Sequence, residues 1–237
     1  RRIMGFGAGE SDIEAMLPDM IRRKREPVVG ITVSGATITL RITTSGPNDA
    51  TCQQAMGPTV AEIHEALGVM VFGEEDDELE HAVVRLLNGR KQTVAVAEWA
   101  TDGLVSQWLA EAISGSDCFR GGIVVRNVIM LNSLLGIEID PHNAADETTA
   151  SAMSRAVRER CNTDYGLAIS AFPSSGKTEP TAAAPPAAEM SGSLQVALAA
   201  GNTVRVKGFP IATHPAITKT RSAKQALNML RLAMING

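Results

Sequence analysis

Hydrophobic and polar residues follow two different periods in the first third of the chain. Residues 10–24 place apolar side chains every four positions, which predicts a helix, although Pro18 inside it costs about 3 kcal/mol. Residues 28–44 alternate apolar and polar positions around a turn at 34–36, which predicts a β-hairpin. Residues 49–67 return to a helical period. Together these elements predict a small α+β unit.

The pattern changes after the acidic residues 74–78, and we place a domain boundary there, between residues 1–74 and 75–237. Beyond it, helical periods alternate with apolar runs of strand length, which predicts an α/β fold with an added antiparallel hairpin. The Ala- and Pro-rich segment 174–193 is predicted to be a mobile loop. The predicted order is a helix from 79 that Gly89 caps, a strand at 93–97, a helix at 103–113, a strand and a helix within 121–137, a helix at 146–160 that Asp146 caps, strands at 165–171, 194–200 and 203–210, and a helix at 219–234.

Composition and charge narrow the class of protein. The sequence is 44% hydrophobic and 20% charged, as in ordinary globular proteins, and its net charge of −4 argues against a nucleic-acid surface. Three cysteines without a CxxC pair and four histidines without HxxxH spacing indicate neither disulfides nor a metal site, and no cofactor is expected. No apolar run has the length of a membrane span and no signal-peptide core opens the sequence, so we expect a cytoplasmic protein.

One stretch, AFPSSGKT at 171–178, nearly matches the phosphate loop GxxxxGK[ST]. Ala171 takes the place of the first glycine, and Glu-Pro-Thr follows where a helix should begin. Because the N–H groups of that helix hold the phosphate, we do not expect a nucleoside triphosphate site. The SxxK pattern from Ser174 to Lys177 fails for the same reason, since its serine must begin a helix.

Residues 95–113 predict a strand, a tight turn and a helix, with the turn sequence EWATDG at 98–103. In α/β proteins such a turn commonly holds an anionic ligand, because helix N–H groups converge there. Trp99 and Asp102 do not suit a phosphate, since the indole is bulky and the carboxylate repels an anion. The turn is therefore either a working site or the remains of one.

Over nearly its whole length the chain resembles the competence- and damage-inducible CinA family. The stretches GFGAGESDIEAMLPDMI, ITLRITT and ALGVMVFGEEDDELEHAVVRLL resemble the family's KH-type middle domain, which covers residues 1–74 here. Residues 75–237 resemble its C-terminal nicotinamide-mononucleotide deamidase domain, which implies a three-layer α/β fold with a mixed sheet. The family's N-terminal molybdopterin-binding-like domain has no counterpart in this sequence, which suggests a fragment or a loss.

Four family motifs can be followed through the second region. In the AESCTGG turn the retained residues are Ala97, Glu98, Thr101 and Gly103, and the replaced ones are Trp99, Ala100 and Asp102. In the GSS…F.GG.V.YS…K…LG block Gly115, Ser116, Phe119, Gly121, Gly122 and Gly136 are retained, while Arg126, Asn127 and Leu131 stand for the tyrosine, the serine and the lysine. Asp146 replaces the serine of the AVS helix, and Ser170 replaces the threonine of the TG.AGP loop.

The resemblance implies a ligand pocket formed by Glu98, Trp99, Thr101, Asp102, Gly103, Gly121, Gly122, Arg126, Asn127 and Ser170. Covalent amide hydrolysis needs a nucleophile beside a base, and donors for the oxyanion. Trp99 has no nucleophilic atom and Leu131 cannot transfer a proton. We therefore predict a degenerate site with a ligand-binding, regulatory or scaffold role, in which Trp99 fills the pocket and Asp102 caps the following helix. Its ligand would be a nicotinamide nucleotide or a related small molecule.

Alternatives stay open. A working amidohydrolase on nicotinamide mononucleotide or a related nucleotide amide would use Glu98, Thr101 and Arg126, and predicts that these converge in an open pocket. A remodelled pocket would take its cation from Arg126 and a hydroxyl from Thr101. Nucleic-acid binding through residues 1–74 would need a GxxG loop between helices, which this stretch lacks. A homodimer is expected, and neither a membrane nor a nucleic acid is expected as a partner.

Overall fold

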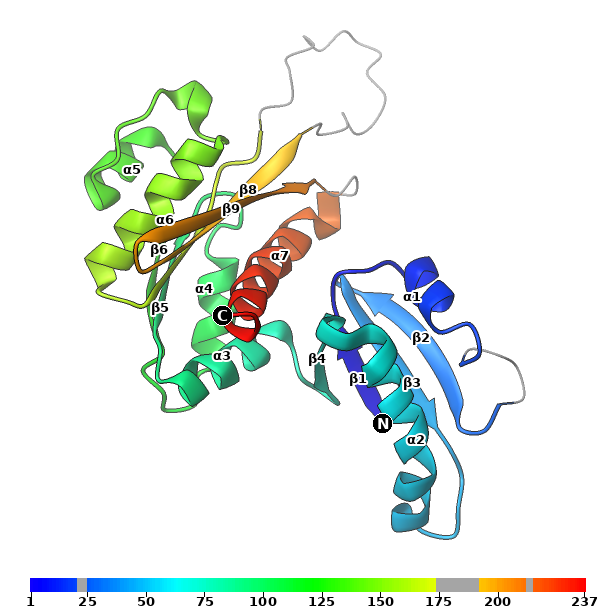
Figure 1. The fold of residues 1–237 in the computed structure, drawn as a ribbon. Coiled ribbons are helices and arrows are strands. Elements are labelled where there is room, and N and C mark those ends of the chain that lie inside the picture. Colours follow the sequence, from blue (N-terminus) through cyan, green and yellow to red (C-terminus); the bar gives the residue numbers. More distant parts are fainter. Residues whose placement is uncertain (21–24, 174–191, 212–214) are drawn as a thin grey trace, which may run out of the picture. The chain divides into compact units, whose positions relative to one another are not determined.

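The computed structural model describes residues 1–20, 25–173, 192–211 and 215–237 (Figure 1). It divides into two units, Arg1–Ala82 and Val83–Gly237, which are described separately. Most of the predicted loop 174–193 lies outside the described residues, and with it the SxxK pattern and the lysine of the AFPSSGKT stretch.

The first unit contains a four-stranded antiparallel sheet with the order β2-β3-β1-β4. Its strands are β1 (Arg2–Gly5), β2 (Val28–Ser34), β3 (Thr37–Thr43) and β4 (Val71–Glu74). The predicted hairpin is confirmed as β2 and β3, and Gly35 and Ala36 take the left-handed φ values of 54° and 64° that a two-residue turn favours. Strands β1 and β4 were not predicted, because four residues each are too few to establish a period.

Two helices accompany this sheet: α1 (Glu10–Met16) and α2 (Asp49–Leu67), and the short 3₁₀ helix η1 (Gly68–Met70) follows α2. The prediction for 49–67 is confirmed, and Asn48 caps this helix by accepting a hydrogen bond of 2.9 Å from the Thr51 N–H. The predicted helix 10–24 ends at Met16 and residues 17–20 are not helical, because Pro18 cannot donate to the helix, while residues 21–24 lie outside the described residues. The core of the unit gathers apolar residues from the sheet and both helices, among them Ile3, Ile13, Ile38, Leu40, Ile42 and Ile63.

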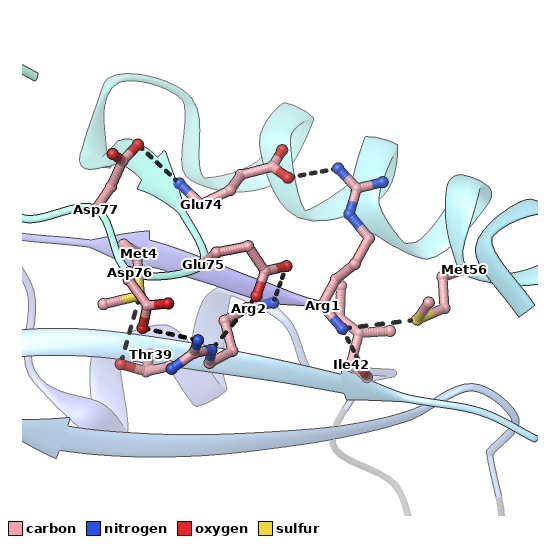
Figure 2. Close-up of polar contacts among 10 residues, drawn as sticks. All are labelled: Arg1, Arg2, Met4, Thr39, Ile42, Met56, Glu74, Glu75, Asp76 and Asp77. Carbon is pink, nitrogen blue, oxygen red and sulfur yellow. Dashed lines mark hydrogen bonds and ion pairs between the residues drawn. The ribbon is translucent and has the colours of Figure 1, made fainter. Parts of the chain in front are cut away.

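Arginines at the start of β1 form ion pairs with acids at the end of β4 and just beyond it (Figure 2). Arg1 pairs with Glu74, and Arg2 contacts Glu75 at 3.4 Å and Asp76 at 2.8 Å. Burial alone would raise the pKa of Glu74, but hydrogen bonding and charge attraction from Arg1 and then from His64 hold the pKa of that carboxyl below its ordinary value. These pairs join the two ends of the first unit's sequence across the sheet.

The second unit contains a five-stranded mixed sheet with the order β6-β5-β7-β8-β9. Its strands are β5 (Val94–Glu98), β6 (Phe119–Val124), β7 (Tyr165–Ile169), β8 (Ser193–Ala200) and β9 (Thr203–Pro210). Strands β5, β6 and β7 are parallel, and β8 and β9 extend the sheet as an antiparallel hairpin, as the sequence predicted. The predicted strand 165–171 ends at Ile169.

Helices cover both faces of this sheet, which gives three layers (Figure 1). Helices α5 (Val128–Leu135) and α6 (Glu147–Cys161) lie on one face, and α4 (Leu104–Ala112) and α7 (Pro215–Ile235) on the other. The remaining helices are α3 (Leu79–Arg90) and the short 3₁₀ helix η2 (Pro141–Asn143). Helix α6 approaches β7 closely at Gly166, where an added Cβ would lie 2.6 Å from the Cβ of Arg158. The predicted mixed α/β fold is confirmed.

Several predicted helix ends need correction. Gly89 lies inside α3, and the left-handed residue that ends this helix is Lys91, with a φ of 53°. Asp146 stands at the N-cap of α6, but its side chain makes no capping hydrogen bond. The last helix begins at Pro215 rather than at Lys219, in line with the preference of proline for the first turn.

Candidate functional site

Glu98 is the last residue of β5, and its carboxylate is fully buried at the start of α4. Its Oε2 accepts from Thr101 Oγ1 at 2.6 Å and from the Val105 N–H at 3.0 Å. Its Oε1 accepts from the Ser106 N–H at 2.8 Å and from Ser106 Oγ at 2.6 Å. The first N–H groups of a helix have no partner within it, and a negative charge there also favours the helix dipole. Glu98, at the end of β5, therefore satisfies N–H groups at the N-terminus of α4.

The prediction that Asp102 caps α4 is wrong. The N-cap position is held by Gly103 with a φ of 91°, and Asp102 itself has a φ of 53°. Glycine adopts such left-handed backbone without strain, and aspartate is one of the few other residues that tolerate it. The geometry thus accounts for the two glycines of the AESCTGG turn and for an aspartate as a permitted replacement.

The Asp102 carboxylate contacts two cations instead. Its Oδ1 pairs with Arg126, from the segment between β6 and α5, and its Oδ2 pairs with Lys219 on the first part of α7. The side chain of Asp102 is 30% exposed, that of Lys219 is 47% exposed and that of Arg126 is 69% exposed. Lys219 was not among the predicted site residues, because 117 positions separate it from Asp102 in the sequence.

Thr101 lies behind this cluster, fully buried, and its hydroxyl donates to Glu98. The amidohydrolase alternative predicted that Glu98, Thr101 and Arg126 converge in an open pocket. Glu98 and Thr101 lie at hydrogen-bond distance, and both are buried. Arg126, the third residue of the predicted catalytic set, pairs with Asp102 on the surface. The hydroxyl and the guanidinium therefore belong to two separate groups, one buried and one exposed.

Trp99 is half-buried and packs against the apolar core beneath α5 and α6. That core includes Leu131, which is fully buried in α5 at the position where the family has its lysine. An apolar side chain there is consistent with its surroundings, since an unpaired ammonium would lose its hydration. Whether the indole fills a former ligand pocket remains a prediction.

Four further predicted residues have structural roles in β6, at the start of α5 and after β7. Gly122 faces Ser106, since an added Cβ would lie 2.7 Å from Ser106 Cβ, and Gly121 has a φ of 137°. Asn127 caps α5 by accepting a hydrogen bond of 2.9 Å from the Met130 N–H. Ser170 is buried at the end of β7, and its hydroxyl accepts from the Gln195 N–H at 3.2 Å.

Among the residues that the structure describes, no group of three or more His, Cys, Asp or Glu side chains is placed to hold a metal ion. Within the same residues, no helix combines the length and the apolar character needed to cross a membrane.

Comparison with known proteins establishes the class. The family model of the CinA C-terminal domain matches residues 76–234, and that of the damage-inducible protein CinA KH domain matches residues 1–73. The chain belongs to the CinA family.

Curated relatives agree with this assignment. A CinA-like protein of Synechococcus sp. (strain CC9902) is 32% identical over 76% of this chain and 44% of its own length. A putative competence-damage inducible protein of Thermoanaerobacter pseudethanolicus is 27% identical over 98% of this chain and 55% of its own length. The chain thus spans about half the length of the curated relatives it matches.

Solved structures share the fold over about two thirds of the chain. The competence-damaged protein (CinA) superfamily protein from Klebsiella pneumoniae 700603 covers 67% of this chain and 97% of its own, with 17% identity and a TM-score of 0.56. The competence/damage inducible protein CihA from Agrobacterium tumefaciens covers 69% of this chain and 99% of its own, with 20% identity and a TM-score of 0.53.

Proposed function

We propose that the second unit is a non-catalytic ligand-binding module of regulatory or scaffold role, derived from a nicotinamide-mononucleotide deamidase. The observation that carries this proposal is the burial of the Glu98–Thr101 pair. A covalent nucleophile must reach the substrate and lose its proton to a nearby base. The Thr101 hydroxyl is fully buried, and each oxygen of Glu98 already accepts two hydrogen bonds. An oxygen with two donors in place has little capacity left to accept a nucleophile's proton.

The ligand that this surface favours is an anion, and the phosphate of a nicotinamide nucleotide supplies one. Arg126 and Lys219 converge on Asp102 from different parts of the chain, so a phosphate that displaced the carboxylate would meet two cations at once. The Asp102 carboxylate competes for the same cations. We therefore expect weak binding in the wild-type chain.

Two measurements test the proposal. We expect no ammonia release from nicotinamide mononucleotide above a buffer blank. In calorimetric titrations with the same nucleotide, Asp102→Asn should bind more tightly than the wild type, because the competing charge is gone while the side-chain shape remains. Asp117→Asn is the matched control, since it removes a carboxylate from another exposed ion pair, with Arg120. Ammonia release that Thr101→Ala abolishes would contradict the loss of catalysis, and equal affinities of both variants would contradict the anion site.

A working amidohydrolase is the second candidate, and the 2.6 Å between Thr101 Oγ1 and Glu98 Oε2 favours it, since nucleophile and base stand at this distance in many hydrolases. It requires that the buried hydroxyl become accessible when substrate binds. The ammonia assay above separates the two candidates.

Nucleic-acid binding through the first unit is the third candidate. A hollow of about 430 Å³ there is lined in part by Arg1, Arg2 and Arg41, which favours an anionic partner. Residues 1–82, however, hold seven Lys and Arg against fourteen Asp and Glu, a formal charge of −7 that would repel a polyanion. We expect no shift of single-stranded RNA or DNA in a low-salt gel assay, and a shift that salt removes would support this candidate.

A further inference from the structure

A hollow of about 320 Å³ is bordered by residues of the edge strand β9 and of helix α7 in the second unit. Its volume falls at the lower end of the range of about 300–1,000 Å³ that small-molecule pockets occupy. None of the residues predicted to form the ligand pocket around 98–103 borders the hollow. It is therefore a separate feature of the same unit.

The strand side of the hollow carries cations above an apolar base. Successive side chains of a strand point to opposite faces, so Arg205, Lys207 and Phe209 share one side of β9. Leu198 pairs with Arg205 across β8 and β9, is only 2% exposed and also borders the hollow. A molecule bound here would meet charged side chains at the rim and aliphatic surface below them.

The helix side presents apolar and amide groups. Gln225, Asn228, Met229 and Leu232 stand at i, i+3, i+4 and i+7, which places them on one face of α7, and all four are partly exposed. The Oδ1 of Asn228 accepts from Arg231 Nε at 3.0 Å, so the amide NH₂ group of Asn228 is left as a donor. This wall offers apolar contact together with neutral hydrogen-bonding groups.

The charge of the hollow has one sign. Within the described part of the chain, the residues that border the hollow include Arg205 and Lys207 and neither Asp nor Glu. The ammonium of Lys207 lies 5.0 Å from the ring centroid of Phe209, a distance at which a cation is attracted to the aromatic face. This contact places a cation and an aromatic surface side by side at the rim.

We propose that the hollow between β9 and α7 binds a small amphipathic anion, with an apolar body about the size of a naphthalene ring system and one acidic head group. The body packs between Leu198, Met229 and Leu232, and the carboxylate, sulfonate or phosphate head pairs with Arg205 and Lys207. The occupant is a soluble small molecule, because the volume suits a ligand of that size and residues of β9 and α7 border it on two sides. The inference does not depend on the activity of the site at 98–103.

A fluorescent probe tests the proposal on the full chain. We titrate 8-anilinonaphthalene-1-sulfonate and, as its uncharged counterpart, N-phenyl-1-naphthylamine, which has the same rings without the sulfonate. The sulfonate should bind at one saturable site per chain, about tenfold or more tightly than the neutral compound, because charge-assisted contacts exceed neutral ones. The double variant Arg205→Gln/Lys207→Gln should remove this preference. The matched double variant Arg155→Gln/Arg160→Gln, which removes two exposed cations on α6 that do not border the hollow, should retain it.

Methyl NMR locates the probe. With ¹³C-methyl methionine, the Met229 signal, assigned through Met229→Leu, should move during the sulfonate titration while that of the fully buried Met153 stays. Binding that does not saturate, an unmoved Met229 signal, or equal loss in the two double variants would overturn the proposal. Light scattering gives one more test. If Arg205→Gln/Lys207→Gln changed the oligomeric state and left the sulfonate affinity unchanged, the hollow would be an interface between copies, and the proposal would be overturned.

Discussion

The hydroxyl of Thr101 donates to Oε2 of Glu98 over 2.6 Å in a fully buried place, at the junction of β5 and α4. The same carboxylate holds the first N–H groups of α4, so one buried charge supports both the turn and the helix. Glu98 therefore has a structural role, because its carboxylate accepts the hydrogen bonds that hold the turn and the start of α4.

Replacing Glu98 by glutamine should therefore destabilise the second unit strongly. The amide would point an NH₂ group at N–H and O–H donors, which leaves buried groups unsatisfied at a cost of about 2–4 kcal/mol. Urea unfolding followed by Trp99 and Trp108 fluorescence measures the effect. Glu111→Gln, on the exposed side of α4, is the control and should change the unfolding free energy by less than about 0.5 kcal/mol. Similar losses in both variants would contradict the role of Glu98.

The left-handed backbone at Asp102 predicts a difference between two substitutions. Asp102→Gly and Asp102→Ala both lose the pairs with Arg126 and Lys219, so these cancel in the comparison. Only alanine is strained at a φ of 53°, and Asp102→Gly should be more stable by about 1 kcal/mol. The same two substitutions at Asp117, which is not among the left-handed residues, should show no advantage for glycine. A more stable Asp102→Ala would refute the assigned backbone.

Replacing a glycine by alanine should lower the stability of the second unit at Gly122 and raise it at Gly89. At Gly122 the added methyl would meet Ser106, which should cost about 1–3 kcal/mol as overpacking does. At Gly89, inside α3, the added methyl meets nothing within 4 Å, and the gain in helix propensity should stabilise by about 0.5–1 kcal/mol. Thermal unfolding of both variants checks the signs, and equal shifts would contradict the close approach of β6 to α4.

The lowered pKa of Glu74 predicts a dependence on Arg1. A carboxyl whose pKa falls on folding stabilises the fold at pH above its unfolded value, and that contribution is lost as the pH falls through the folded pKa, below the ordinary 4.5. Arg1→Gln removes the main favourable partner, so the pKa of Glu74 should rise. An NMR titration of the Glu74 carboxyl measures it. As the control, Arg41→Gln should leave the pKa of Glu74 unchanged. An equal rise of that pKa in Arg41→Gln would show that the overall charge, and not the pair with Arg1, lowers it.

The sequence predicted elements where the pattern is local and long. Strand β9 and helix α2 were predicted with the bounds observed, because alternation and helical period run through their whole length. The end of α3 was misplaced because a lysine, not the nearby glycine, adopts the left-handed conformation there.

The candidate site was predictable to a smaller extent. The donors around Glu98 lie three, seven and eight positions further along the chain, so a local reading could have found them. The partner Lys219 comes from the last helix, and no spacing rule connects it to Asp102. Family motifs indicated which positions matter, whereas the burial of Thr101 and the exposure of Arg126 required the fold.

The occupied amides at the start of α4 have a consequence for any anion that binds nearby. Since the N–H groups of Val105 and Ser106 already hold Glu98, a bound anion would depend on Arg126 and Lys219, both in contact with solvent. Dissolved salt screens such exposed charges over about 8 Å at physiological ionic strength. Occupancy of this surface should therefore fall steeply as ionic strength rises, so the salt concentration around the protein would set whether the ligand is held.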